Sequence, residues 1–453
     1  MKVLLISTYE LGRQPFGLAS PAAWLEQAGA SVECADLSRQ ALPEDAVRSA
    51  DLVGFYVPMH TATRLALQVL PQVRALNPRA HICFYGLYGP VNEAYLRGQG
   101  AETILGGEFE AGLVSIVQRL AGNGSTAQSE PVVSLARQSF VVPERRGLPP
   151  LAQYAHLNHP DARPRVVGYT EASRGCKHLC RHCPIVAVYR GVFRIVQREV
   201  VLEDIHRQVA AGAEHITFGD PDFFNGIRHA VELARALHRE FPKLTYDVTI
   251  KIEHLLRHAE HLSTLRETGC VLVTSAAESV EDAILQKLAK GHTLADFVAV
   301  VNLCREAGLA LSPTFVAFTP WTTPAGYQNL LARIGELDLI EQVAPIQLAI
   351  RLLIPAGSRL LELEEIRRLV GPFDEEALVY PWRNPHAEVD ALAGDVLKGV
   401  MEGEKRRLTR REIFEDVWKI SHQTFNLPVP RLPGVADLVS RAAIPYLTEP
   451  WYC

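Results

Sequence analysis

Short apolar runs alternate with helix-like stretches in two blocks of the chain, and this alternation limits the fold more than any other feature. The first block fills about the first 120 residues, and the second runs from Val166 to QLAIRLLIP (347–355), its last strand-like run. Such alternation is typical of βαβ units, which build parallel sheets. The second block holds roughly six units, too few for a closed eight-fold barrel and suited to an open or partial one. The sequence therefore predicts an α/β protein.

A stretch dense in Gly, Ser and Pro separates the two blocks. It begins with GNGSTAQSEP at residue 122 and continues to VPERRGLPPLAQY, a composition that suits a linker. The last ~90 residues are mainly helical and charged, and then become Pro-rich at NLPVPRLPG. These changes predict four segments, which are a sheet domain over 1–122, a linker over 123–165, a second α/β core over 166–360 and a helical C-terminal region over 361–453.

Composition restricts the class of protein. Among 453 residues, 46 Lys and Arg against 51 Asp and Glu give a formal net charge of −5, with 48% hydrophobic and 21% charged residues. These are ordinary values for a globular protein. No run approaches the roughly 18 apolar residues that a membrane-spanning helix needs. We expect a soluble, cytoplasmic protein that does not bind nucleic acid, because a dedicated nucleic-acid binder usually shows a basic stripe.

Turns of small residues follow the strand ends of the first block. They read TYE (8–10), GLYG (86–89) and GGE (106–108). In an open α/β sheet, ligands bind at the carboxyl ends of the strands. The candidate cofactor contacts in these turns are Tyr9, Gly86, Gly106 and Gly107.

Three of the eight cysteines fall within eight residues, as Cys176-x3-Cys180-x2-Cys183 in SRGCKHLCRHCP, directly after an apolar segment. Three thiolates can bind three irons of a [4Fe–4S] cluster, while the fourth iron stays open for a substrate or cofactor. One alternative is a zinc site completed by His178 or His182, although structural zinc usually pairs two separated C-x2-C halves and no second half is present. The other alternative is a set of incidental cysteines.

The cysteine spacing and the segments downstream of it resemble the radical S-adenosylmethionine (SAM) enzymes. That resemblance implies a [4Fe–4S] cluster on the three cysteines, after the first strand of a partial (β/α)6 barrel. The segments that carry it are HITFGDPDFF (215–224), TIKIEH (249–254), VTSAAES (273–279) with LAKGHT (288–293), and LLIPAGSRL (352–360). One position departs from the family: the residue before the third cysteine is usually large and apolar, and here it is His182.

The resemblance also implies where SAM binds. It assigns Gly219, Asp220 and Asp222 to the turn that receives the SAM amino group, Lys251 to the SAM carboxylate, Ser275 and Glu278 to the ribose and methionine portions, and Pro355 and Gly357 to the vicinity of adenine. For Lys251 and Glu278 the alternative is a solvated or barrel-lining charge.

The first block resembles the N-terminal Rossmann-like domain of the cobalamin (B12)-binding subgroup of radical SAM enzymes. The resemblance covers about residues 1–360 and implies cobalamin at the strand-end turns, with His60 as a further candidate contact. The motif D-x-H-x-x-G, which supplies a cobalt ligand in methionine-synthase-like domains, does not occur. The resemblance therefore implies cobalamin held without a protein histidine on the cobalt. A domain that has lost its cofactor is the alternative.

Methylthiotransferases combine similar domains but need a second cluster on three further N-terminal cysteines. Only Cys34 and Cys83 are available, which argues against that family.

The last residues, IPYLTEPWYC, end in Cys453. They resemble the radical SAM group known as the CUAEP/CCAEP-tail proteins, in which a cysteine precedes selenocysteine or a second cysteine. That resemblance implies a selenoprotein tail and a catalytic, substrate-handling role for Cys453. A terminal cysteine without a role is the alternative.

The function implied is reductive cleavage of SAM and modification of a small-molecule substrate, by cobalamin-dependent methyl transfer or a related radical transformation. The implied cofactors are a [4Fe–4S] cluster, SAM and cobalamin. The expected partners are a small-molecule substrate and a reductant such as flavodoxin or ferredoxin, with no nucleic acid and no membrane. The alternative is an iron–sulfur redox or binding protein that uses its tail thiols to capture a metal or metalloid without radical chemistry.

Overall fold

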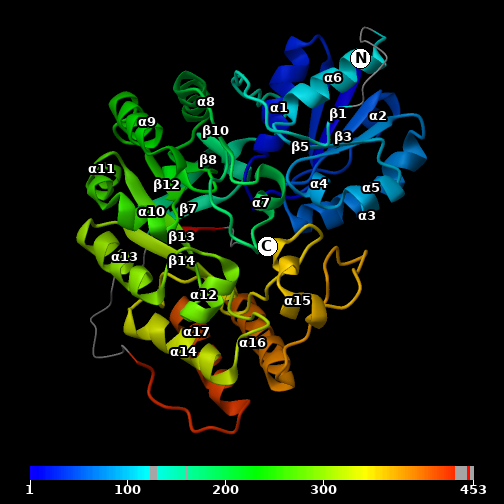
Figure 1. The fold of residues 1–453 in the computed structure, drawn as a ribbon. Coiled ribbons are helices and arrows are strands. Elements are labelled where there is room, and N and C mark those ends of the chain that lie inside the picture. Colours follow the sequence, from blue (N-terminus) through cyan, green and yellow to red (C-terminus); the bar gives the residue numbers. More distant parts are fainter. Residues whose placement is uncertain (123–129, 160–161, 434–445, 449–453) are drawn as a thin grey trace.

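The computed structural model describes residues 1–122, 130–159, 162–433 and 446–448. It forms two mainly parallel sheets that meet along one side, followed by a helical region (Figure 1). Within these ranges, no helix is both long and apolar enough to cross a lipid bilayer. The expected fold class, a Rossmann-like sheet followed by a partial barrel and helices, is confirmed.

The first sheet has six parallel strands in the order β2-β1-β3-β4-β5-β6. Its strands are β1 (Lys2–Ser7), β2 (Ser31–Asp36), β3 (Leu52–Tyr56), β4 (His81–Tyr85), β5 (Thr103–Gly107) and β6 (Val133–Ser134), and its helices are α1 (Phe16–Gln27), α2 (Glu44–Ser49), α3 (His60–Leu76), α4 (Tyr88–Val91), α5 (Glu93–Gly98) and α6 (Glu110–Leu120). Helices α1 and α6 cover one face, and α2, α3 and α5 cover the other. Because both faces are covered, the central strands are almost continuously apolar.

The second sheet has the order β14-β13-β12-β11-β8-β7-β15 and curls into a half-barrel. Its parallel strands are β8 (Ala162–Thr170), β11 (His215–Phe218), β12 (Thr245–Thr249), β13 (Cys270–Glu278) and β14 (Ala310–Phe315). The helices around it are α8 (Arg198–Ala210), α9 (Ile227–Glu240), α10 (Ile252–Arg257), α11 (Leu262–Glu267), α12 (Asp282–Leu288), α13 (Leu294–Glu306) and α14 (Pro324–Glu336). Strands β7 (His156–His159) and β15 (Tyr446–Leu447) add antiparallel pairings at the β8 side.

The sixth barrel strand expected at QLAIRLLIP is not formed. Its first residues lie in a 3-10 helix, Pro345–Leu348, and one parallel bridge joins Phe318 to Arg351. The Gln347 side-chain oxygen accepts a hydrogen bond from the backbone N–H of Phe315 at 3.0 Å. A side chain therefore satisfies a group on β14 that a neighbouring strand would otherwise bond.

The segment predicted as a linker contributes β6 to the first sheet and β7 to the second. Arg145, from this segment, forms an ion pair with Asp204 of α8 at 2.8 Å and donates hydrogen bonds to Gln14 and to the carbonyl of Tyr169. These contacts tie the two sheets together.

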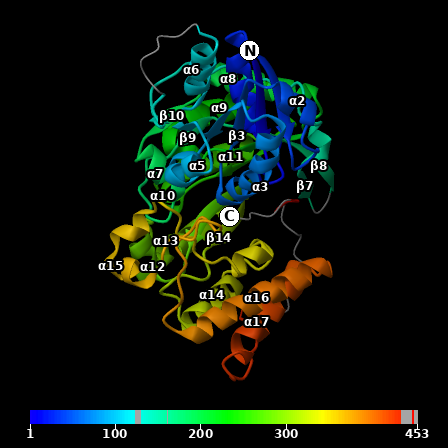
Figure 2. The same ribbon diagram turned by 90° about the vertical axis from the view of Figure 1, so that its right-hand side faces the viewer.

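The C-terminal region contains α15 (Glu364–Leu369), α16 (Ala387–Lys405) and α17 (Arg410–Gln423). Figures 1 and 2 show α16 and α17 side by side below the half-barrel, next to α14. Their apolar side chains join the barrel core. A capping box between Thr409 and Glu412 fixes the start of α17.

Candidate active site

The cysteine loop leaves the half-barrel at the carboxyl end of β8. The short strand β9 (Ser173–Gly175) pairs antiparallel with β10 (Phe193–Ile195) and leads into Cys176. Gly175 has φ +72°, and a Cβ there would lie 2.3 Å from the Tyr189 ring. Only glycine fits this position, so the backbone turns sharply before the first cysteine.

The three thiols lie together on this loop, which ends where Cys183 begins α7 (Pro184–Tyr189). Cys180 is buried and the other two are half-buried. Burial, reinforced by Cys180, raises the pKa of Cys183 to about 12, and burial also raises the pKa of Cys176. Thiols with raised pKa values are poor nucleophiles. Three cysteines on one loop fit the three-ligand set of a [4Fe–4S] cluster better than covalent catalysis.

Backbone contacts from three other elements hold the loop. The Lys177 N–H donates to Asn225 Oδ1 at 3.3 Å, and the Arg181 N–H donates to the Leu288 carbonyl at 2.9 Å. Arg359 donates to the Leu179 carbonyl at 3.0 Å. Arg359 directly follows the turn that contains Pro355 and Gly357, so the structure brings those predicted residues close to the loop.

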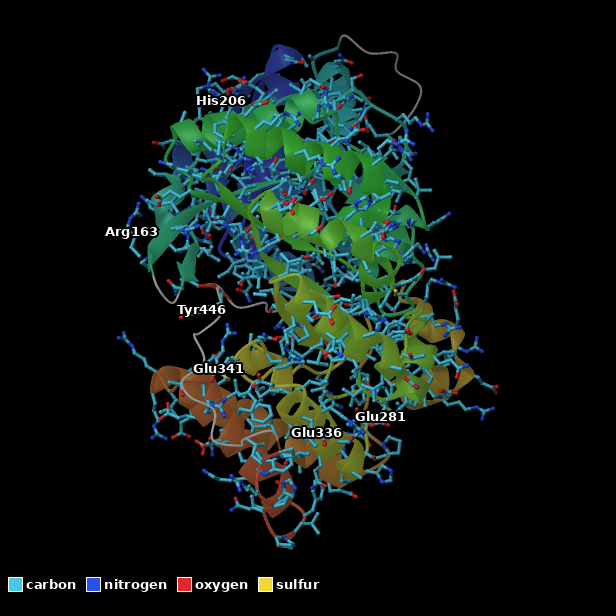
Figure 3. All side chains as sticks on the ribbon, turned by 90° about the vertical axis from the view of Figure 1, so that its left-hand side faces the viewer. Arg163, His206, Glu281, Glu336, Glu341 and Tyr446 are labelled. Atoms are coloured by element: carbon cyan, nitrogen blue, oxygen red, sulfur yellow. The ribbon has the colours of Figure 1, made fainter. Side chains whose placement is uncertain are left out.

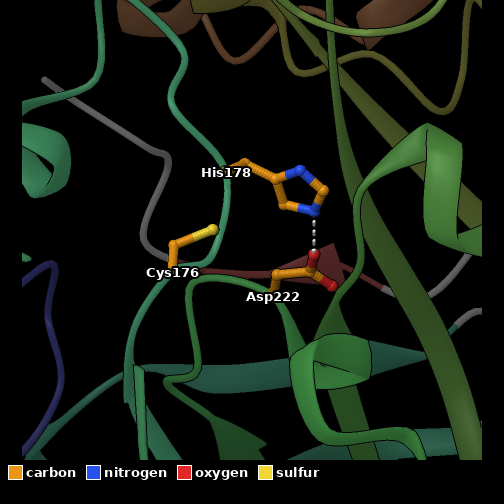
Figure 4. A group of neighbouring side chains, drawn as sticks. All are labelled: Cys176, His178 and Asp222. Carbon is orange, nitrogen blue, oxygen red and sulfur yellow. Dashed lines mark ion pairs between the residues drawn. The ribbon is translucent and has the colours of Figure 1, made fainter. Parts of the chain in front are cut away.

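A group of charged side chains lies beside Cys176 (Figure 4). Asp222 pairs with His178 at 3.4 Å and with His254 at 2.6 Å. Burial raises the pKa of Asp222, but the two imidazoles outweigh it and hold the value at about 2. Lys251 Nζ lies 3.1 Å from His178 Nδ1. The predicted residues Asp222 and Lys251 therefore meet at His178, within the cysteine loop.

The donor atoms of Cys176, His178 and Asp222 lie within 4.8 Å of one another, so they could also hold a metal ion. A zinc site is therefore still possible, with Asp222 as a ligand in addition to Cys176 and His178. Metal analysis distinguishes the two sites, because a cluster requires iron and sulfide and this alternative requires zinc.

A second buried ion pair lies on the other side of the loop. Glu278 Oε1 is 3.0 Å from His182 Nε2 and 3.3 Å from Lys290 Nζ. Burial raises the pKa of Glu278, but Lys290 and His182 reverse the shift and bring it to about 2. The contact gives His182, the departure from the family pattern, a physical role. The sequence pattern predicts no role for Lys290, although this residue lies within LAKGHT.

Three predicted residues are already engaged within the protein. Ser275 donates to the Ile250 carbonyl at 2.6 Å, and Asp220 accepts hydrogen bonds from the Ala172 N–H and the Ser173 hydroxyl. A Cβ on Gly219 would lie 1.8 Å from Tyr169 Oη. Their contacts support the strand ends around the loop.

A cavity of about 190 Å³ lies between the two sheets. Its lining from the first sheet includes Tyr56, Gly86, Gly107 and Phe109, and its lining from the half-barrel includes Ser173, Arg174, Gly175 and Gly219. Two of the predicted turns, those with Gly86 and Gly107, thus face the segment that precedes the cysteine loop. Gly106 lines a different hollow, Tyr9 is outside this lining, and His60 Nε2 contacts the Ala377 carbonyl at 2.5 Å.

One arginine, Arg174, pairs with three glutamates in the interface between the two sheets. Arg174 lies 2.6 Å from Glu110, 2.8 Å from Glu171 and 3.5 Å from Glu108, and Tyr189 also donates to Glu108. Burial raises the pKa values of Glu108 and Glu171 to about 7, against the lowering effect of Arg174. No local sequence pattern predicts this cluster, because its members come from separate segments.

Residues 170–321 match the model of the Radical SAM superfamily. The chain therefore carries a radical SAM domain. This domain contains the cysteine loop together with Asp222, Lys251, Glu278 and Lys290.

Comparisons over a longer part of the chain agree with this domain. The hopanoid C-3 methylase of Methylococcus capsulatus is 24% identical over 339 residues, which cover 70% of this chain and 64% of that protein. The chain thus spans just under two thirds of this curated relative.

Two solved structures share the fold. The radical SAM methyltransferase TsrM from Kitasatospora setae, solved with cobalamin and a [4Fe–4S] cluster, superposes with a TM-score of 0.60 at 19% identity and covers 74% of this chain and 73% of its own. The cobalamin-dependent SAM radical enzyme OxsB, solved with aqua-cobalamin and SAM, has a TM-score of 0.72 at 14% identity, over 94% of this chain and 72% of its own.

Proposed function

We propose that the chain is a radical SAM enzyme that cleaves SAM reductively and modifies a small-molecule substrate. The observation that carries the proposal is the grouping of Cys176, Cys180 and Cys183 on one loop, inside the segment that matches the radical SAM model. In this proposal the three thiolates bind a [4Fe–4S] cluster and leave one iron open.

A bound, reduced cluster would supply the one electron that SAM accepts when its carbon–sulfur bond breaks. The chain orients SAM and excludes water. Lys251 binds the SAM carboxylate, Asp222 binds the amino group, and Glu278 accepts hydrogen bonds from the ribose. The turn at Pro355 and Gly357 lies beside adenine.

Three further predicted residues, Gly219, Asp220 and Ser275, contribute to the SAM site by fixing the strand ends. Burial of the ion pair between Glu278 and Lys290 supports a site shielded from solvent.

We also propose that cobalamin binds between the two sheets, at the turns that contain Tyr9, Gly86, Gly106 and Gly107. The position of the interdomain cavity supports this for the turns with Gly86 and Gly107, which line it together with residues of the half-barrel. A buried carboxylate of the lining, Glu171, can accept hydrogen bonds from the carboxamides of a corrin. The cavity of about 190 Å³ is smaller than the several hundred Å³ of an ordinary ligand pocket, so binding requires the two sheets to separate on this side.

Purification with added hydroxocobalamin tests the cobalamin proposal. We expect a retained corrinoid whose cob(II)alamin EPR spectrum lacks histidine splitting. A protein that retains no corrinoid would support the alternative of a lost cofactor, and a histidine splitting would refute the ligand assignment.

Cys453 lies outside the described residues. Its role as a substrate-handling thiol, the selenocysteine tail and a reductant such as flavodoxin or ferredoxin stay predictions. If Cys453 handles the substrate, Cys453→Ser should keep cluster content and SAM cleavage and lower product formation. Loss of the cluster in this variant would contradict that role.

Anaerobic reconstitution with iron and sulfide, followed by SAM and dithionite, tests the activity. We expect 5′-deoxyadenosine or another SAM cleavage product. The iron–sulfur redox or binding protein considered from the sequence would give a cluster but no SAM cleavage product, and that result would overturn the proposed function.

A further inference from the structure

A second cavity lies inside the half-barrel and has a volume of about 220 Å³. Its wall includes Thr249, Thr274 and Thr314, from three neighbouring strands. Thr249 precedes Lys251 by two residues along an extended backbone, so both side chains leave the strand on the same face. The cavity therefore lies about one layer of side chains below the proposed SAM site.

Two guanidinium groups from distant parts of the chain line this cavity. Arg410, at the start of α17, stacks on the Tyr446 ring at 4.7 Å and donates one hydrogen bond to the Glu341 carbonyl at 2.8 Å. Figure 3 shows Tyr446 and Glu341 where β15 passes between the half-barrel and the helical region. Arg13, which follows β1, stacks on the Tyr169 ring at 5.0 Å.

Neither arginine forms an ion pair with any residue that the structure describes. Each guanidinium carries five N–H donors, and one hydrogen bond accounts for few of them. Burial lowers the pKa of Arg410. The carboxylate of Glu341 acts on Arg410, and that of Glu10 acts on Arg13, but both lie beyond ion-pair distance. The two aromatic rings hold both cations at the cavity.

The other polar groups of the cavity reinforce this excess of donors. The hydroxyls of Thr249, Thr274 and Thr314 make no hydrogen bond with the described part of the chain. Of the two carboxylates in the lining, Asp247 already accepts from His215 at 2.8 Å and from Thr217 at 2.5 Å. Glu404 also has an interaction of its own.

We propose that this cavity binds a small molecule with an acidic oxygen group, a carboxylate or a phosphate, between Arg13 and Arg410. Guanidinium groups recognise both acids through paired N–H donors. The threonine hydroxyls bind further oxygen atoms of the molecule. The identification of this acid as the substrate rests on the proposed function, because the cavity lies next to the proposed SAM site.

Calorimetric titration of the full-length, anaerobically reconstituted protein at constant ionic strength tests the site. The probes are succinate and inorganic phosphate, with neutral succinamide as the uncharged control. We expect millimolar or tighter binding of at least one acid and none of succinamide. The acid that binds identifies the group, carboxylate or phosphate, that the cavity prefers.

Arg410→Gln should weaken this binding at least about tenfold, the loss expected for a hydrogen bond to a charged group. Arg411→Gln is the matched control, because Arg411 is the next residue on α17, pairs with Glu341 at 3.5 Å and does not line the cavity. Unchanged binding in Arg410→Gln, or no binding of either acid to the wild type, would overturn the proposal.

A second variant covers the case in which Arg410→Gln does not fold. Thr314→Val keeps the side-chain shape and removes one hydroxyl. This variant should also weaken the binding of the acid. Cluster content and SAM cleavage without added acid are measured on the same preparations. Arg410-dependent binding without SAM cleavage would contradict the proposed function alone, whereas SAM cleavage without Arg410-dependent binding would contradict this inference alone.

Discussion

The carboxyl ends of the two sheets face each other across the interdomain cavity, but they are built from different side chains. At the half-barrel, charged residues such as Lys251 and Glu278 are buried against the cysteine loop. At the first sheet, Tyr56, Tyr85 and Phe109 pack ring to ring, with centroids 5.1–6.1 Å apart.

This difference matters because buried charges are stable only with partners. The carboxyl end of the half-barrel carries buried charged groups that can contact a charged ligand. The carboxyl end of the first sheet is packed with aromatic rings. We therefore expect the half-barrel to bind its cluster and cleave SAM without cobalamin.

The largest effect should come from the cysteine loop. Cys180→Ala should lose the cluster absorption and all SAM cleavage, because cluster assembly needs all three thiolates. Iron and sulfide analysis together with product chromatography measure both. Cys304→Ala is the control, since Cys304 is buried in α13, outside the loop. A full cluster in Cys180→Ala would contradict the assignment of the half-barrel loop as the cluster site.

A large effect on stability should come from Lys290. Lys290→Met leaves Glu278 buried without its cation, and removal of one partner of a buried pair typically costs about 3–5 kcal/mol. Lys287→Met is the control on the preceding helix, because Lys287 pairs with Glu365 at the surface and such pairs contribute about 0–1 kcal/mol. Urea unfolding of both variants measures the difference. Equal losses in the free energy of unfolding would show that the buried pair stabilises the fold no more than the surface pair does.

The interdomain cluster should produce a smaller, pH-dependent effect. Glu108 faces Arg174, Glu110, Glu171 and Tyr189, and burial raises its pKa from 4.5 to about 7. The folded protein therefore holds this proton at higher pH than the unfolded chain does. The contribution of Glu108 to the free energy of unfolding falls as pH rises from about 4.5 to about 7, by about 1–3 kcal/mol.

Glu108→Gln removes that proton. The free energy of unfolding of this variant, relative to the wild type, should therefore rise between pH 5 and pH 8, by about 1–3 kcal/mol. The surface variant Glu93→Gln, whose partner is Arg97, should show no such trend. A constant difference between Glu108→Gln and the wild type would contradict the assignment.

The smallest effect concerns the corrinoid. Protein prepared without corrinoid should keep its cluster content and should cleave SAM, in the absence of substrate, within about twofold of the loaded protein, as expected for independent sites. Quantification of the SAM cleavage product in both preparations measures this. A much larger loss would show that the two edges act as one site.

The sequence was sufficient for the parallel strands of both sheets except β6, because apolar runs and Gly or Pro turns are local signals. Strand β6 has two residues and lies in the segment predicted as a linker. It failed at QLAIRLLIP, where the Gln347 side chain bonds β14 and no sixth strand forms. It also failed at β15, a short strand that pairs with β7 from almost 290 residues away.

In the candidate site, too, some residues follow from local patterns and others depend on contacts between distant segments. Local spacing predicts the three cysteines as cluster ligands, and the resemblance predicts Lys251 and Glu278 as SAM contacts. The partners of these residues, such as Lys290, and the cluster around Arg174 depend on contacts between distant segments, which no local pattern encodes.

The central claim is that three cysteines hold a cluster with one iron open to SAM. The most direct measurement is the EPR spectrum of the reduced, reconstituted full-length protein before and after addition of SAM. The account predicts the signal of one reduced [4Fe–4S] cluster, with g-values that shift when SAM binds. A spectrum unchanged by SAM, or a purified protein that holds zinc in place of iron, would contradict it.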